Sequence, residues 1–78
     1  MKKALFIEGN RNGYGPEQCG RTLTVGELIE FLRDFDEDRE VFIRNDSGYT
    51  YGSIREDDIN SGTYDENSGE VEFEGWIA

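Results

Sequence analysis

Histidine is absent from this 78-residue chain. The sequence therefore lacks the commonest general base, the usual neutral metal ligand, and the partner that activates a serine or cysteine nucleophile. No motif places a carboxylate pair or a tyrosine for acid-base work. We expect a protein that is not an enzyme, with no catalytic residues, no metal and no cofactor.

Cysteine and long apolar runs are also scarce. Cys19 is the only cysteine, so the chain cannot form an intramolecular disulfide or a cysteine metal site, and nothing points to an oxidising compartment. The apolar run at residues 4–7 ends at Glu8, which is too early for the core of a signal peptide. No stretch approaches the roughly 20 apolar residues of a membrane span. We expect a cytoplasmic protein that does not bind membranes.

Positive charge is scarce and unevenly placed. The chain contains eight basic residues and eighteen carboxylates, and its formal net charge is −10. Residues 34–78 hold fourteen of those carboxylates and three arginines, a net of −11, whereas residues 1–33 have a net of +1. Such a surface repels nucleic-acid phosphates and attracts a basic partner, so direct nucleic-acid binding is not expected. Because crowded carboxylates repel one another, mild acid is expected to stabilise the protein.

A single amphipathic helix is predicted over residues 25–35. Thr24 and Glu27 have the spacing of a capping box, which marks the helix start. Apolar residues recur at the spacing of one helical face, which we expect to pack against a sheet. These residues are Val25, Leu28, Ile29, Leu32 and Phe35. The acidic residues that follow oppose the helix dipole and should end the helix.

Strands are predicted near residues 4–7, 41–43, 49–54 and 70–76, with a turn at 45–48. Residues 9–22 and 59–69 are rich in glycine and asparagine and are expected to be long loops. The chain should therefore form a single small α+β domain over residues 1–78. Its one amphipathic helix should pack on a mostly antiparallel sheet of about four strands.

The last strand alternates with period two. Val71, Phe73 and Trp76 should face the core, while every second residue is a glutamate that should point outward in a row. Those glutamates and two further acidic runs are the candidate partner-binding residues: Asp36, Glu37, Asp38, Glu56, Asp57, Asp58, Glu70, Glu72 and Glu74. Presented together, they would mimic a nucleic acid and occupy a basic channel of a nucleic-acid-binding protein. The same acids would also suit a housekeeping domain whose charge only keeps it soluble.

A second hypothesis is a small-ligand site. Arginines bracket the first glycine-rich loop, and tyrosines offer stacking surfaces, a combination suited to an anionic nucleotide signal. The residues of this alternative site are Arg11, Tyr14, Arg21, Tyr49 and Tyr51. The protein would then bind or sequester a nucleotide instead of inhibiting a protein.

Residues 23–32 read Leu-Thr-Val-Gly-Glu-Leu-Ile-Glu-Phe-Leu and are followed by an acidic stretch and Val41-Phe42-Ile43. This pattern resembles small acidic proteins of phages and prophages that carry a TVGELI helix. Such viral proteins include anti-CRISPR and other anti-defence inhibitors, some of which are DNA mimics, and sponges for nucleotide signals. The resemblance implies either an inhibitor of a host defence effector or a sponge for a nucleotide signal, and it assigns no site residue.

Overall fold

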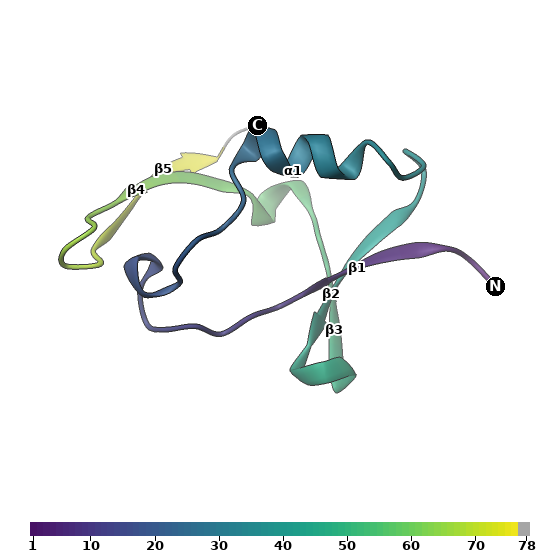
Figure 1. Ribbon diagram of the computed structural model, residues 1–78, viewed down its shortest axis with the longest axis horizontal. Coiled ribbons are helices and arrows are strands. Elements are labelled where there is room, and N and C mark those ends of the chain that lie inside the picture. The colour runs from purple at the N-terminus through teal and green to yellow at the C-terminus, as the bar shows by residue number, and fades with distance from the viewer. Residues whose placement is uncertain (77–78) are drawn as a thin grey trace. The chain divides into compact units, whose positions relative to one another are not determined.

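The computed structural model describes the backbone of residues 1–76 and the side chains of residues 1–74. The chain divides into two compact units. Unit 1 comprises Met1–Gly9 and Arg21–Ser53, and unit 2 comprises Asn10–Gly20 and the chain from Ile54 onward. The α+β class is confirmed, because the described residues form one α-helix and two small sheets (Figure 1).

Unit 1 contains a three-stranded sheet in the order β1 (Ala4–Glu8), β2 (Glu40–Asn45) and β3 (Thr50–Ser53). β1 pairs with β2 in parallel, because the chain crosses over through the helix between them, and β2 pairs with β3 antiparallel. Leu5 lies opposite Val41, and Phe6 lies opposite Phe42. Apolar residues therefore occur on both faces of the sheet, a pattern typical of parallel strands.

The turn between β2 and β3 falls where the sequence predicts it. Three consecutive residues there have positive φ, with values of 48° for Asp46, 58° for Ser47 and 99° for Gly48. Arg44 stabilises this unusual backbone, since its Nη2 donates to the carbonyl oxygen of Ser47 at 2.7 Å. Its Nη1 donates to Glu8 Oε1 at 3.1 Å, which ties the turn to β1.

Helix α1 (Val25–Leu32) begins at the predicted capping box. The backbone N–H of Glu27 donates to Thr24 Oγ1 at 3.2 Å, and the backbone N–H of Thr24 donates to Glu27 Oε1 at 3.0 Å. The helix ends at Leu32 and not at the predicted residue 35, with Arg33 as its C-cap. The physical reason is the acidic stretch after it, whose carboxylates oppose the negative end of the helix dipole.

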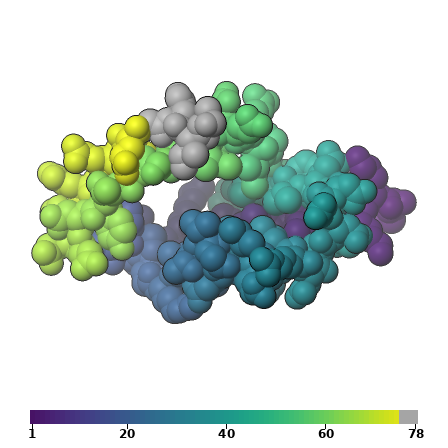
Figure 2. All heavy atoms as spheres, turned by 90° about the horizontal axis from the view of Figure 1, so that it is seen from above, coloured from purple at the N-terminus to yellow at the C-terminus, as the bar shows by residue number. Residues whose placement is uncertain are grey.

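The prediction that the helix stripe packs into a core is wrong for its first two turns. No side chain among those described is fully buried, and Val25 is 77% exposed. Leu28 and Ile29 are also exposed, and only Leu32 and Phe35 are half-buried. Figure 2 shows this part of the chain, in blue to teal, at the molecular surface. A helix of eight residues is short, and only its C-terminal end lies beside the strands of its unit.

Unit 2 contains the antiparallel hairpin of β4 (Asn60–Tyr64) and β5 (Val71–Trp76), with 3-10 turns at Pro16–Gln18 and Glu56–Asp58. The expected inward positions in this hairpin are wrong, because Val71 and Phe73 are 42% and 71% exposed. A two-stranded hairpin offers no second layer under which they could be buried. The side chain of Trp76 lies outside the described residues.

β4 lies inside the segment 59–69, which the sequence predicts to be a loop. The prediction fails because the strand reads Asn-Ser-Gly-Thr-Tyr and carries no apolar alternation. It is held in place by pairing with β5 and by a tight connecting turn. In that turn Asp65 Oδ1 accepts the backbone N–H groups of Asn67 at 2.7 Å and Ser68 at 3.1 Å.

A β-bulge interrupts the hairpin. Gly62 lies opposite Phe73 and Ser61 lies opposite Gly75, so Glu74 is the extra residue on β5. The regular outward row of three glutamates is therefore not continuous, because the alternation breaks between Phe73 and Gly75.

Candidate functional site

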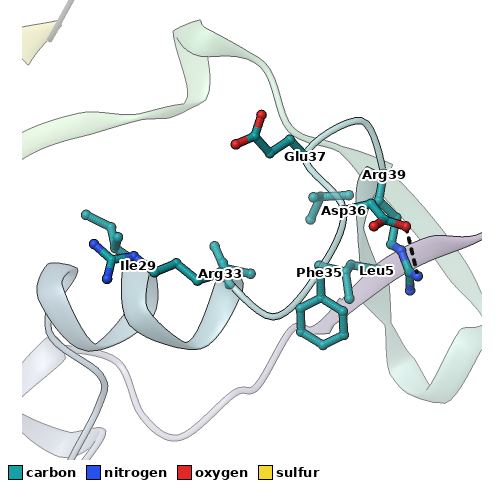
Figure 3. Close-up of a pocket in the computed structure, with 9 residues that line it drawn as sticks. Leu5, Ile29, Arg33, Phe35, Asp36, Glu37 and Arg39 are labelled. Carbon is teal, nitrogen blue, oxygen red and sulfur yellow. Dashed lines mark ion pairs between the residues drawn. The ribbon is translucent and has the colours of Figure 1, made fainter.

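An apolar groove opens in unit 1 between the C-terminal half of α1 and the strands β1 and β2 (Figure 3). Its volume is about 410 Å³. Aliphatic and aromatic side chains from all three elements, and from the segment after the helix, line it. These residues are Leu5, Ile29, Leu32, Phe35 and Val41. The space in which a helix would usually pack on its sheet is thus open to a second molecule.

The charged border of the groove comes mainly from the acidic loop, residues 34–38, together with arginines on both sides of it. Arg33 Nη1 pairs with Glu30 Oε2 at 3.1 Å, and Arg39 Nη2 pairs with Asp36 Oδ2 at 3.8 Å. Glu37 also borders the groove, and none of the described residues forms an ion pair with it. The positive charges of Arg33 and Arg39 are therefore already balanced by the carboxylates of Glu30 and Asp36.

Arg39 fixes the shape of the acidic loop. Its side chain is only 20% exposed, and its guanidinium carbon lies 5.5 Å from the centre of the Phe35 ring. Its backbone N–H donates to the carbonyl oxygen of Asp36 at 3.2 Å. The cation–π contact and this turn hold Phe35 beside the groove. Sequence reasoning missed Arg39, although its spacing of three from Asp36 and four from Phe35 is a usable signal.

The nine candidate partner-binding residues fall into both units. Asp36, Glu37 and Asp38 belong to the acidic loop of unit 1, and the other six belong to unit 2. In unit 2 the acids at residues 56–58 form a 3-10 turn, Glu72 and Glu74 lie in β5, and Glu70 immediately precedes it. All nine side chains are exposed.

The charge differs between the units. Unit 1 has nine carboxylates and six basic residues, and its ion pairs include Lys2–Glu40 at 2.7 Å and Arg44–Glu8 at 3.1 Å. Unit 2 has nine carboxylates and two arginines, a net charge of −7. None of its glutamates in or beside β5 forms an ion pair with a described residue. Most of the unpaired negative charge is therefore carried by unit 2.

The alternative ligand residues are also divided between the units. Arg11 and Tyr14 belong to unit 2, whereas Arg21, Tyr49 and Tyr51 belong to unit 1. Arg21 Nη2 donates to Glu27 Oε2 at 2.7 Å and so supports the helix cap. Tyr51 packs edge-on to the ring of Phe6, with 5.9 Å between ring centres. None of the three in unit 1 lines the apolar groove.

Hydrogen bonds lower the pKa of two carboxyl groups. Backbone donation from Thr24 lowers the pKa of Glu27, and the Thr24 hydroxyl and Arg21 act in the same direction. The backbone N–H groups of Asn67 and Ser68 lower the pKa of Asp65. Each group binds its proton less readily in the folded chain than in the unfolded chain.

These shifts act at lower pH than the mild acid in which relief of carboxylate repulsion is expected, and they have the opposite sign. A carboxyl group with a lowered folded pKa stabilises the fold above its unfolded pKa, and that contribution is lost as the pH falls through the folded value. We therefore expect the melting temperature to fall on acidification below about pH 4.5, the ordinary carboxyl range. Asp65→Asn should flatten the profile in this range, and a melting temperature that rises as the pH falls below about 4.5 would contradict this account.

Among the described residues, no helix combines the length and the apolar character needed to cross a membrane. The same residues contain no cluster of three or more thiol or carboxylate side chains placed to hold a metal ion. No protein-family model, curated protein or solved structure matches this chain.

Proposed function

We propose that the chain is a non-enzymatic acidic binding protein that docks on a basic protein and blocks its nucleic-acid channel. The observation that carries this proposal is the charge of unit 2, which contains nine carboxylates and only two arginines. The glutamates of β5 and the acids at residues 56–58 are exposed, so they are available to a partner. The partner class, a host defence effector, follows from the resemblance to phage anti-defence proteins.

The proposed mechanism is competition for basic side chains. Lysines and arginines of a nucleic-acid channel normally bind phosphates, and carboxylates accept the same charge-assisted hydrogen bonds. Alternate residues of a strand are about 7 Å apart, which is close to the spacing of phosphates along one nucleic-acid strand. Glu70 and Glu72 have this spacing in the sequence, and the bulge places Glu74 out of strict alternation. The charges also accelerate the encounter with a basic surface.

The test replaces Glu70, Glu72 and Glu74 together by glutamine. Because these side chains are exposed, the fold should persist, while affinity for a purified nucleic-acid-binding defence effector should fall about tenfold, at roughly 0.5 kcal/mol for each exposed charge. The loss should arise mainly in the association rate and should shrink at high salt. Stopped-flow binding at two salt concentrations measures both effects.

A matched control removes other negative charges, and the loss of affinity is compared per charge removed. Glu8 and Glu40 are each paired with a basic residue of unit 1 and do not line the groove, and the control replaces both by glutamine. If unit 2 is the binding surface, this control should bind nearly as the parent does. Equal inhibition by the parent and by the Glu70, Glu72 and Glu74 variant would falsify the proposed function.

A further inference from the structure

The apolar groove and the acidic loop share Phe35, Asp36 and Glu37. We propose that the groove is the anchor pocket for the basic partner, and that it receives one large apolar side chain from a lysine- or arginine-rich segment. This inference rests on the proposed function and deepens it. It adds a specific contact to an interaction that would otherwise depend on charge alone.

The apolar lining supports an anchor. The groove volume of about 410 Å³ lies within the range of pockets that hold ligand groups, roughly 300–1,000 Å³. Ile29 is 52% exposed, and Leu32 and Phe35 are half-buried, so apolar surface still faces solvent at this site. Interfaces concentrate their binding energy where a large side chain fills such a pocket, and surrounding polar contacts contribute less.

The border supports a basic partner. Residues 30–39 carry five carboxylates and two arginines, a net charge of −3. The two arginines are paired with Glu30 and Asp36, which leaves three carboxylates of the acidic loop without an ion pair to any described residue. These are Asp34, Glu37 and Asp38, of which Glu37 lines the groove. An apolar floor bordered by the unpaired Glu37 carboxylate, within a segment of net negative charge, complements an apolar residue flanked by lysines or arginines.

The same charges disfavour a second copy of the chain as the occupant. A two-fold contact between two grooves would bring two acidic loops to the same interface. Like charges at an interface cost free energy and suppress such a pairing. The arginines are held by their own partners, so they do not offer compensation across the contact.

The test uses a defined peptide probe, Lys-Lys-Ala-Phe-Ala-Lys-Lys, and the same peptide with alanine in place of phenylalanine. Binding to the whole chain is measured by isothermal titration calorimetry at low salt. The phenylalanine peptide should bind about tenfold more tightly or better, since burial of one large apolar side chain has that effect. Equal affinities of the two peptides would overturn the anchor proposal.

Two helix variants locate the anchor site. Ile29→Ala removes a groove-lining side chain and should cut the preference for phenylalanine to about threefold or less. Val25→Ala is the matched control, because it is a β-branched residue on the same helix, is 77% exposed and does not line the groove. Val25→Ala should keep the full preference, and far-UV circular dichroism checks that both variants retain the helix. A preference that survives Ile29→Ala unchanged would overturn the assignment of the groove.

The remaining outcomes separate this inference from the proposed function. Glu37→Gln should weaken both peptides at low salt and leave the phenylalanine preference intact, because it removes charge and not apolar surface. If both peptides bind equally and both weaken when Glu70, Glu72 and Glu74 become glutamine, the groove is not used and the proposed function stands. Self-association of the chain that Ile29→Ala abolishes, measured by sedimentation velocity, would assign the groove to a second copy and overturn the proposal.

Discussion

Gly62→Ala is expected to unpair β4 from β5. A Cβ atom at this position would lie 2.5 Å from the carbonyl oxygen of Glu72 and 3.3 Å from Cα of Phe73. Both are backbone atoms of the opposite strand, so they cannot rotate away as a flexible side chain would. The cost should reach or exceed the ~1–3 kcal/mol of ordinary overpacking. Hydrogen exchange should show loss of protection at the amides of both strands.

Gly26→Ala provides the matched control. Apart from the adjoining residues and the backbone of the helix itself, no atom lies within 4 Å of a Cβ atom built at Gly26, which is inside α1. Replacing a helical glycine by alanine should stabilise the chain by about 0.5–1 kcal/mol. The two substitutions add the same methyl group and should shift the urea midpoint in opposite directions. Equal protection of the hairpin amides in the parent and in Gly62→Ala would contradict the bulge geometry.

The hairpin geometry also bears on the proposed function. Gly62 allows the close approach at which the register shifts, and the shift makes Glu74 the extra residue of β5. The direction of this carboxylate therefore depends on a glycine in the neighbouring strand. If Gly62→Ala lowers partner affinity beyond its effect on stability, the position of Glu74 matters as well as its charge.

Local signals were sufficient to predict part of the fold. The capping box of Thr24 and Glu27 involves residues three apart, and the structure confirms it. The turn before β3 depends on a short Asp-Ser-Gly sequence, which tolerates positive φ. In both cases the residues that determine the local backbone geometry are close together in the sequence. The α+β class follows from the same local patterns.

Other features depend on pairing between distant residues and could not be predicted from the sequence. β4 is a polar segment that becomes a strand because β5 pairs with it. The bulge at Gly62 exists only in the register of that pair. The parallel pairing of β1 with β2 joins residues more than thirty positions apart.

The candidate site shows the same division. The acidic residues were found from composition, because charge is visible in the sequence. The apolar groove was missed, since the helical stripe predicts a packed core and does not show where the helix stands away from its sheet. Leu5 and Val41 lie opposite each other in β1 and β2, and they line one groove with Ile29 only in the folded unit.

The second large effect is expected from Phe42→Ala. Phe42 is half-buried in β2, the central strand of its sheet, and its ring stacks on Phe6 with 5.9 Å between ring centres. Phe6 in turn contacts Tyr51 of β3, so the three rings connect all three strands. Truncation of a fully buried phenylalanine costs about 3–5 kcal/mol, and we expect about 2 kcal/mol for this half-buried ring.

Tyr49→Ala is the control for that loss. Tyr49 is 87% exposed and should change the free energy of unfolding by less than about 0.5 kcal/mol. Phe42→Leu should recover part of the loss by restoring apolar volume without the ring.

Because successive residues of a strand point to opposite faces, Phe42 lies on the face away from Val41 and the groove. Phe42→Ala should therefore lower the urea midpoint while the folded fraction keeps its preference for the phenylalanine peptide. Equal midpoints for Phe42→Ala and Tyr49→Ala would show that the aromatic cluster does not hold the sheet together.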